Sequence, residues 1–245
     1  MNKERPLVVV ILAAGQGKRM KSELPKVMHL VRGQPMIRHV VHTAQAMQPR
    51  KIVIIVGVGR DKIIHELRGE SVEFTIQEQQ LGTGHAVLQA QEYLRGFSGD
   101  VLILSGDVPL LSELTLDKLL HRHYVSHAAA TVLSTIIDNP TGYGRVIRKA
   151  DGLLQRIVEE KDCTPEERQI QEINAGVYLF DADTLYRYLP RVSNANAQQE
   201  YYLPDVLPLI LAGNGYIAVE QITDAREVAG VNTLQQLEEI NRIYP

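Results

Sequence analysis

The sequence of 245 residues has one cysteine, little net charge and no long apolar run. A lone Cys163 excludes both an intramolecular disulfide and a cluster of thiolate metal ligands, and it suits a reducing compartment. The formal net charge of −3 provides no general positive field for nucleic acid or an anionic membrane. We therefore expect neither a nucleic-acid partner nor a membrane partner.

The amino-terminal segment lacks the features of a targeting signal. Its first six residues, MNKERP, are polar, and the apolar run after them has only the length of a strand. A signal peptide or a membrane-spanning helix needs a longer apolar segment. We therefore expect a cytoplasmic protein, and the content of 44% hydrophobic and 22% charged residues is typical of a globular one.

The most informative segment is LAAGQGKRM, residues 12–20, which directly follows an apolar run. Its small residues and glycines let a ligand approach the backbone and accept hydrogen bonds from N–H groups. Four cations lie within nine residues: Lys18, Arg19, Lys21 and Lys26. This combination is typical of a site for phosphates.

Two common phosphate motifs do not match this segment. It lacks the spacing of a P-loop, and Met20 stands where a dinucleotide fingerprint needs its third glycine. An alternative remains open from this segment alone, namely a glycine-rich turn between a strand and a helix with solvated lysines.

Strand and helix patterns alternate through the first half of the chain. Apolar runs typical of strands buried on both faces occupy residues 7–12, 52–56 and 101–104, with a further strand near 72–77. Helical spacing of apolar residues covers 36–47, 61–67 and 86–94. The alternation predicts a doubly wound α/β fold with a mainly parallel sheet.

The second half is less regular. Residues 128–136 and 173–180 have strand patterns, and residues 203–211 are predicted to form a helix with Pro204 in its first turn. Thr233 and Gln236 have the spacing of a capping box, which predicts a C-terminal helix over 233–244 with Asn232 just before it. No repeat or linker divides the chain, so we expect a single domain over residues 1–245.

Ligands of such folds bind beyond the carboxyl ends of the strands, where Asp107 follows one apolar run and the glycine loop follows another. A carboxylate at this edge could hold a divalent cation against phosphate oxygens. Taken alone, Asp107 could equally cap a turn before Pro109.

Seven segments, in order along nearly the whole chain, resemble the sugar-nucleotide pyrophosphorylases. They are LAAGQGKRM with LPKV, QLGTGHA (80–86), GDVPLL (106–111), NPTGYGR (139–145), IVEEKD (157–162), EINAGVY (172–178) and GVN (230–232). Together they are most similar to the uridylyltransferase domains of bacterial N-acetylglucosamine-1-phosphate uridylyltransferases. The resemblance implies a Rossmann-like nucleotidyltransferase core.

The resemblance also implies a role for each matching residue. Arg19 and Lys26 would be catalytic, in contact with the triphosphate. The nucleotide would be bound by Leu12, Ala13, Ala14, Gly15, Lys26, Gln77, Gln80, Gly82, Thr83, Ser105, Gly106 and Asp107. The sugar would be bound by Gly144, Glu159, Asn174 and Asn232, and a Mg²⁺ cofactor by Asp107 and Asn232.

The reaction implied is the transfer of uridylyl from UTP to N-acetylglucosamine-1-phosphate, giving UDP-N-acetylglucosamine, a cell-wall precursor, and pyrophosphate. A nucleotide-binding part would cover about residues 1–126, and a sugar-binding part about residues 127–231. Two alternatives remain: the same reaction with another sugar phosphate or nucleotide, and a non-catalytic nucleotide-sensing subunit.

The sequence departs from the family pattern at three points. Lys18 replaces the usual Thr or Ser, and Pro204 replaces a Thr. Bifunctional relatives continue into an acetyltransferase domain, which we do not expect here because the chain ends at Pro245. No oligomeric state is predicted.

Overall fold

The computed structural model describes residues 5–243. Its strands are β1 (Leu7–Ala13), β2 (Leu30–Val31), β3 (Gln34–Pro35), β4 (Lys51–Val56), β5 (Glu73–Ile76), β6 (Asp100–Ser105), β7 (Ala130–Ile136), β8 (Arg145–Arg148), β9 (Leu154–Val158), β10 (Glu172–Asp181) and β11 (Ile217–Ile222). Its α-helices are α1 (Met36–Ala46), α2 (Arg60–Glu66), α3 (Thr83–Leu88), α4 (Glu113–Val125), α5 (Ala182–Tyr188), α6 (Val206–Ala212) and α7 (Leu234–Ile243). Within the described residues, none of the helices has the length and apolar character that crossing a membrane requires.

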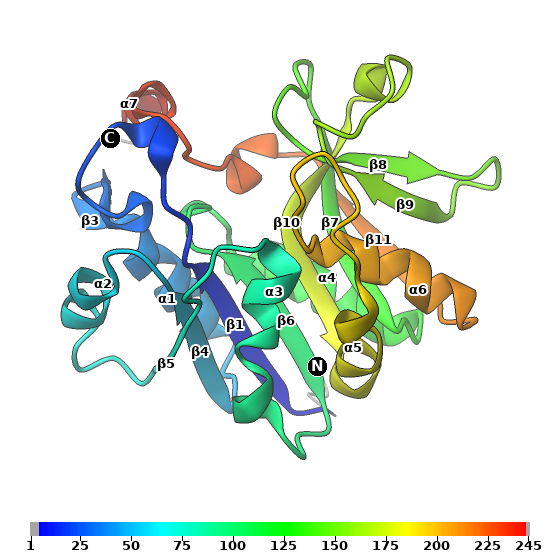
Figure 1. Ribbon diagram of the computed structural model, residues 1–245, viewed down its shortest axis with the longest axis horizontal. Helices are drawn as coiled ribbons and strands as arrows, with labels where there is room; N and C mark the ends of the chain where they lie inside the picture. Colours follow the sequence, from blue (N-terminus) through cyan, green and yellow to red (C-terminus); the bar gives the residue numbers. More distant parts are fainter. Residues whose placement is uncertain (1–4, 244–245) are drawn as a thin grey trace.

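A nine-stranded, mostly parallel sheet runs through the molecule, with its main path in the order β11-β7-β10-β6-β1-β4-β5 (Figure 1). β5, β4, β1 and β6 are mutually parallel, as are β7 and β11. The prediction of a mainly parallel α/β fold is confirmed. Strand β10 runs antiparallel to both of its neighbours, β6 and β7, which its apolar pattern did not indicate.

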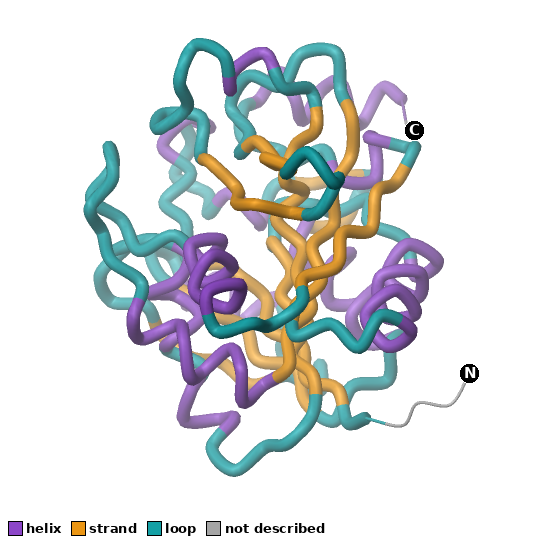
Figure 2. Tube along the Cα trace, turned by 90° about the vertical axis from the view of Figure 1, so that its right-hand side faces the viewer, coloured by secondary structure: helices purple, strands orange, loops and turns teal. Residues whose placement is uncertain are grey.

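Helices cover both faces of the sheet, which Figure 2 shows edge-on. The strands are apolar on both sides because alternate residues point to opposite faces. Val9 and Ile11 of β1 belong to one apolar cluster with residues of α1, α2 and α4, whereas Val8 and Val10 belong to a second cluster with residues of α3, α5 and α6.

Two predicted helices are interrupted. The helical pattern over residues 86–94 becomes α3 followed by a 3₁₀ helix, η3 (Gln91–Leu94), because the backbone tightens to bonds such as Ala90 N–H to Val87 C=O. The hydroxyl of Thr75 donates a hydrogen bond to the Gln89 carbonyl at 3.0 Å. The helix predicted from residue 203 starts as a 3₁₀ turn, η6 (Leu203–Asp205), with Pro204 in that first turn as expected.

The C-terminal capping box is confirmed. Thr233 Oγ1 accepts a hydrogen bond from the N–H of Gln236 at 3.2 Å, and Gln236 Oε1 accepts one from the N–H of Thr233 at 3.1 Å. Asn232 stands immediately before this box, as predicted. The last residue of the predicted helix, 244, lies outside the described residues.

Candidate functional site

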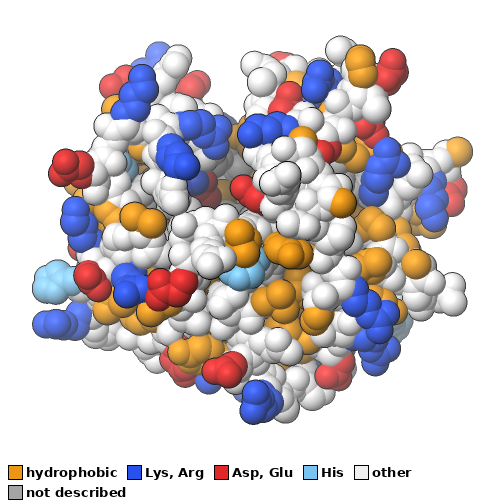
Figure 3. Space-filling view, viewed as in Figure 1, with side chains coloured by type: hydrophobic (Ala, Val, Ile, Leu, Met, Phe, Trp, Pro, Cys, Tyr) orange, Lys and Arg blue, Asp and Glu red, His pale blue; other side chains and the backbone are white. Residues whose placement is uncertain are grey.

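A cavity of about 560 Å³ opens at the carboxyl ends of β1 and β6. In Figure 3 a hollow separates two upper lobes of the molecule, and Lys and Arg side chains gather at its edge. The cavity is lined by Leu12, Ala13, Ala14, Gly15, Gln16, Gly17, Lys18, Arg19, Lys26, Val27, Gln77, Gln80, Gly82, Thr83, Ala86, Ser105, Asp107, Glu200 and Asn232. It lies where open α/β sheets bind their ligands.

The glycine loop turns sharply after β1. Gly17 has a φ of 60°, and a Cβ at this position would lie 2.8 Å from Lys26 Cβ, so a side chain would collide there. A short 3₁₀ helix, η1 (Lys18–Met20), follows it. Met20 is fully buried against Val231 and neighbouring residues, which anchors the loop while Arg19 remains exposed beside the cavity.

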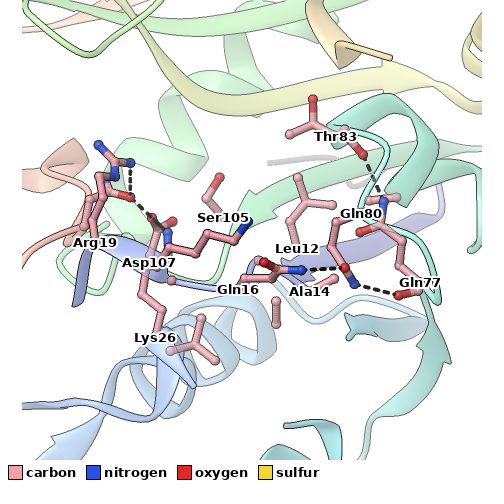
Figure 4. A pocket seen from close by; sticks show the side chains of 18 of the residues that line it. Leu12, Ala14, Gln16, Arg19, Lys26, Gln77, Gln80, Thr83, Ser105 and Asp107 are labelled. Atoms are coloured by element: carbon pink, nitrogen blue, oxygen red, sulfur yellow. Dashed lines mark hydrogen bonds and ion pairs between the residues drawn. The ribbon is translucent and has the colours of Figure 1, made fainter. Parts of the chain in front are cut away.

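Two cations and two oxygen-bearing side chains form a compact cluster at one end of the cavity (Figure 4). Lys26 Nζ lies 2.5 Å from Asp107 Oδ2 and 3.1 Å from Asn232 Oδ1. Arg19 Nη2 donates to the same Asn232 oxygen at 2.9 Å, across 213 residues of sequence. Lys26 and Asp107 are largely shielded, with 17% and 16% of their side chains exposed.

Asn232 reaches this cluster because the chain following β11 returns to the end of β6. The N–H of Val231 donates to the carbonyl of Asp107 at 3.0 Å. Gln236 Oε1 accepts from the Asn232 N–H at 2.8 Å, and Ile240 of α7 packs with Met20 and Val231. The start of α7 and the glycine loop therefore hold each other in place.

The opposite end of the cavity carries amide side chains. Gln77 Nε2 donates to the Gly82 carbonyl at 3.0 Å, and Gln80 Nε2 donates to the Gln77 carbonyl at 3.1 Å. Gln16 of the glycine loop donates a hydrogen bond from Nε2 to Gln80 Oε1 at 3.1 Å. Thr83 Oγ1 accepts a hydrogen bond from the N–H of Leu203, so η6 contacts the start of α3.

Three predicted sugar residues lie together, but outside the lining of this cavity. Asn174 N–H donates to the Gly144 carbonyl at 2.9 Å. A Cβ at Gly144 would lie 3.3 Å from a Glu159 carboxyl oxygen and 3.5 Å from Asn174 Cβ. Asn232, the fourth predicted sugar residue, lies instead with the cations.

An unusual electrostatic environment surrounds Glu159. Burial of the carboxyl, followed by the charges of Asp205, Asp162 and Glu200, raises the pKa of Glu159 to about 7. The guanidinium of Arg145 acts in the opposite direction. Glu200, one of these charges, also lines the main cavity.

The donor set suits a hard cation that keeps most of its own water. Among residues 5–243, no three His, Cys, Asp or Glu side chains gather as metal ligands. The ammonium of Lys26 nevertheless contacts oxygens of both Asp107 and Asn232, so these two oxygens are close enough to bind the same cation. One carboxylate and one carboxamide match the few protein ligands that Mg²⁺ requires beside phosphates.

Most predicted nucleotide residues line the cavity. Gly106, which follows β6, does not line it, and its N–H donates to the Leu12 carbonyl at 2.9 Å. Gln16 and Glu200 also line the cavity but were not among the predicted residues. Gln16 lies inside the glycine-loop motif and could have been included, whereas no motif marked Glu200.

Comparison with known proteins gives concordant results. A family model described as the MobA-like NTP transferase domain matches residues 9–161. Bifunctional protein GlmU of Halalkalibacterium halodurans is 48% identical over 94% of this chain and 51% of that protein. GlmU of Geobacillus thermodenitrificans is 45% identical over 96% of this chain and 51% of that protein. The chain thus spans about half the length of the curated relatives it matches.

A solved structure agrees with the fold. UDP-glucose pyrophosphorylase complexed with UDP-glucose superposes with a TM-score of 0.78 over 98% of both chains, at 19% identity. The family match covers more than half of the chain and includes the glycine loop, Lys26 and Asp107. The chain therefore belongs to the family of MobA-like NTP transferase domains.

Proposed function

We propose that this chain transfers uridylyl from UTP to N-acetylglucosamine-1-phosphate, giving UDP-N-acetylglucosamine and pyrophosphate. The observation that carries the proposal is the cluster of Arg19, Lys26, Asp107 and Asn232 at one end of a cavity that could enclose a nucleotide. The identity of 45% to 48% with GlmU proteins supports this substrate pair. The single buried Cys163 favours a reaction in the cytoplasm.

The cationic end of the cavity would hold the triphosphate. A sugar phosphate oxygen attacks the α-phosphorus, and negative charge grows on the departing pyrophosphate. The planar fork of Arg19 and the point charge of Lys26 would stabilise that charge and orient the phosphates. A Mg²⁺ ion held by Asp107 and Asn232 would neutralise further phosphate charge when bound. The sugar phosphate is already ionised, so the chain need not supply a general base.

The nucleotide and the sugar would occupy different parts of the chain. Residues of about 1–126 would bind the nucleotide, with the small loop residues against its phosphates and Gln77, Gln80 and Thr83 at the opposite end. Residues of about 127–231 would bind the sugar through Gly144, Glu159 and Asn174. Glu159 would accept hydrogen bonds from sugar hydroxyls, which are strongest when its carboxyl is ionised.

The substrate pair is tested by pyrophosphate release. UTP with N-acetylglucosamine-1-phosphate and Mg²⁺ should give the highest kcat/KM, compared with glucose-1-phosphate and with the other nucleoside triphosphates. A higher value for another pair would change the assigned substrates. Nucleotide binding without turnover of any pair would instead indicate a sensing subunit.

Lys26 should compete with a divalent cation in the absence of nucleotide, because its ammonium contacts both proposed metal ligands. Lys26→Met removes a positive charge from within hydrogen-bond distance of Asp107, so we expect Mn²⁺ affinity to rise by at least about tenfold. Electron paramagnetic resonance of free Mn²⁺ measures this directly. Lys21→Met, which removes an exposed cation of the same loop, is the matched control. Equal affinities of the two variants would exclude the competition.

The pH dependence of sugar binding tests the role of Glu159. Its pKa is raised to about 7, so its ionised form is lost as the pH falls through 7. One pH unit below that pKa only about a tenth is ionised, so KM for the sugar phosphate should rise up to about tenfold from pH 8 to pH 6. Glu159→Gln cannot titrate and should retain only the dependence due to the substrate's own phosphate. Identical pH profiles for the two proteins would exclude this role.

A further inference from the structure

Strand β10 is irregular at the point where it carries Asn174. Asn174 pairs with Ser134 of β7, but the next paired residue is Tyr178, opposite Val132. Residues 175–177 therefore face a single residue of β7, and the strand bulges. Gly176 in the bulge has a φ of 72°, a conformation that glycine adopts without strain.

Both ends of the Asn174 carboxamide are hydrogen-bonded within this bulge. Its Oδ1 accepts from the N–H of Gly176 at 3.2 Å, and its Nδ2 donates to the hydroxyl of Tyr178 at 2.6 Å. The first contact fixes which side of the group carries the oxygen. The second fixes its rotation, so the group has one defined orientation.

Tyr178 is itself held rigidly. The residue is 3% exposed, and its ring stacks on Phe180 at a centroid distance of 5.9 Å. Burial, together with the charge of Glu159, raises the pKa of the Tyr178 phenol, which keeps it protonated. The hydroxyl therefore accepts from Asn174 while lying in the electrostatic field of Glu159, the other proposed sugar residue.

We propose that Tyr178 is a positioning residue for the sugar phosphate, because its hydroxyl fixes the carboxamide of Asn174 in the orientation that sugar binding requires. The inference rests on the proposed function. A carboxamide has two N–H donors and two acceptor lone pairs. Gly176 and Tyr178 use one of each, which leaves one N–H and one lone pair to recognise a polar group of the sugar.

Tyr178→Phe tests this with the smallest change. The ring and its packing remain, but one buried N–H of Asn174 loses its partner and the carboxamide can rotate. We expect KM for N-acetylglucosamine-1-phosphate to rise about five- to tenfold, the cost of one hydrogen bond. KM for UTP and kcat should remain within about twofold, because the triphosphate end is untouched.

Tyr186→Phe is the matched control. Tyr186 also has a buried hydroxyl, but this hydroxyl has no hydrogen-bond partner within the described residues, and it lies on α5. Its removal should leave the KM for the sugar phosphate unchanged. Thermal unfolding of each variant checks the fold. If Tyr178→Phe does not unfold cooperatively, Tyr178→Met replaces it with the same expectation.

A double-mutant cycle separates positioning from general packing. In an Asn174→Ala background, Tyr178→Phe should produce no further rise in the KM for the sugar phosphate, because Tyr178 acts through Asn174. A further rise of the same size, an equal rise in the KM for UTP, or no rise in the single variant would each overturn the inference. Absence of turnover by the wild-type protein would instead overturn the proposed function, and the inference with it.

Discussion

The contact between Lys26 and Asp107 is the interaction on which the rest of the site depends. It joins the loop after β1 to the end of β6, with the ammonium nitrogen 2.5 Å from the carboxylate oxygen. Asn232 completes it from the start of α7. The doubly wound topology makes this possible, because parallel β1 and β6 are neighbours and end at the same edge. Asp107 thus holds Lys26 in position, whereas Asn232 contacts both Lys26 and Arg19.

The bulge in β10, which carries the proposed sugar-binding residue Asn174, is connected to strand β6. The hydroxyl of Ser105, at the end of β6, donates to the carbonyl of Gly176 at 3.4 Å. A Cβ at Gly176 would lie 3.2 Å from that hydroxyl oxygen. The residue two positions before Asp107 thus contacts the bulge that orients Asn174. The cation cluster at one end of the cavity suits phosphates, whereas the acidic surroundings of Glu159, outside the cavity lining, suit hydroxyl groups.

Much of the fold and of the cation cluster could be predicted from sequence because the signals are local. Apolar runs give the strands, and the capping box gives the start of α7 and the place of Asn232. The bulge between Asn174 and Tyr178 could not be predicted, because β10 is antiparallel and its register depends on β7, some forty residues away in sequence. Glu200 belongs to no sequence motif. It lies just before η6, which contacts the cavity residue Thr83 through a hydrogen bond over 120 residues of sequence. The α-helix α3 ends before the apolar periodicity does, and at that point the Gln89 carbonyl accepts a hydrogen bond from Thr75 of β5.

The most direct test of the account is Mg²⁺-dependent pyrophosphate release by Asp107→Ala, compared with Asp183→Ala on the exposed surface of α5. Loss of Asp107 removes the carboxylate that Lys26 contacts and that we assign to Mg²⁺. We expect Asp107→Ala to be a folded protein without measurable turnover at any Mg²⁺ concentration, whereas Asp183→Ala retains near wild-type kcat. Wild-type turnover by a folded Asp107→Ala protein would contradict it.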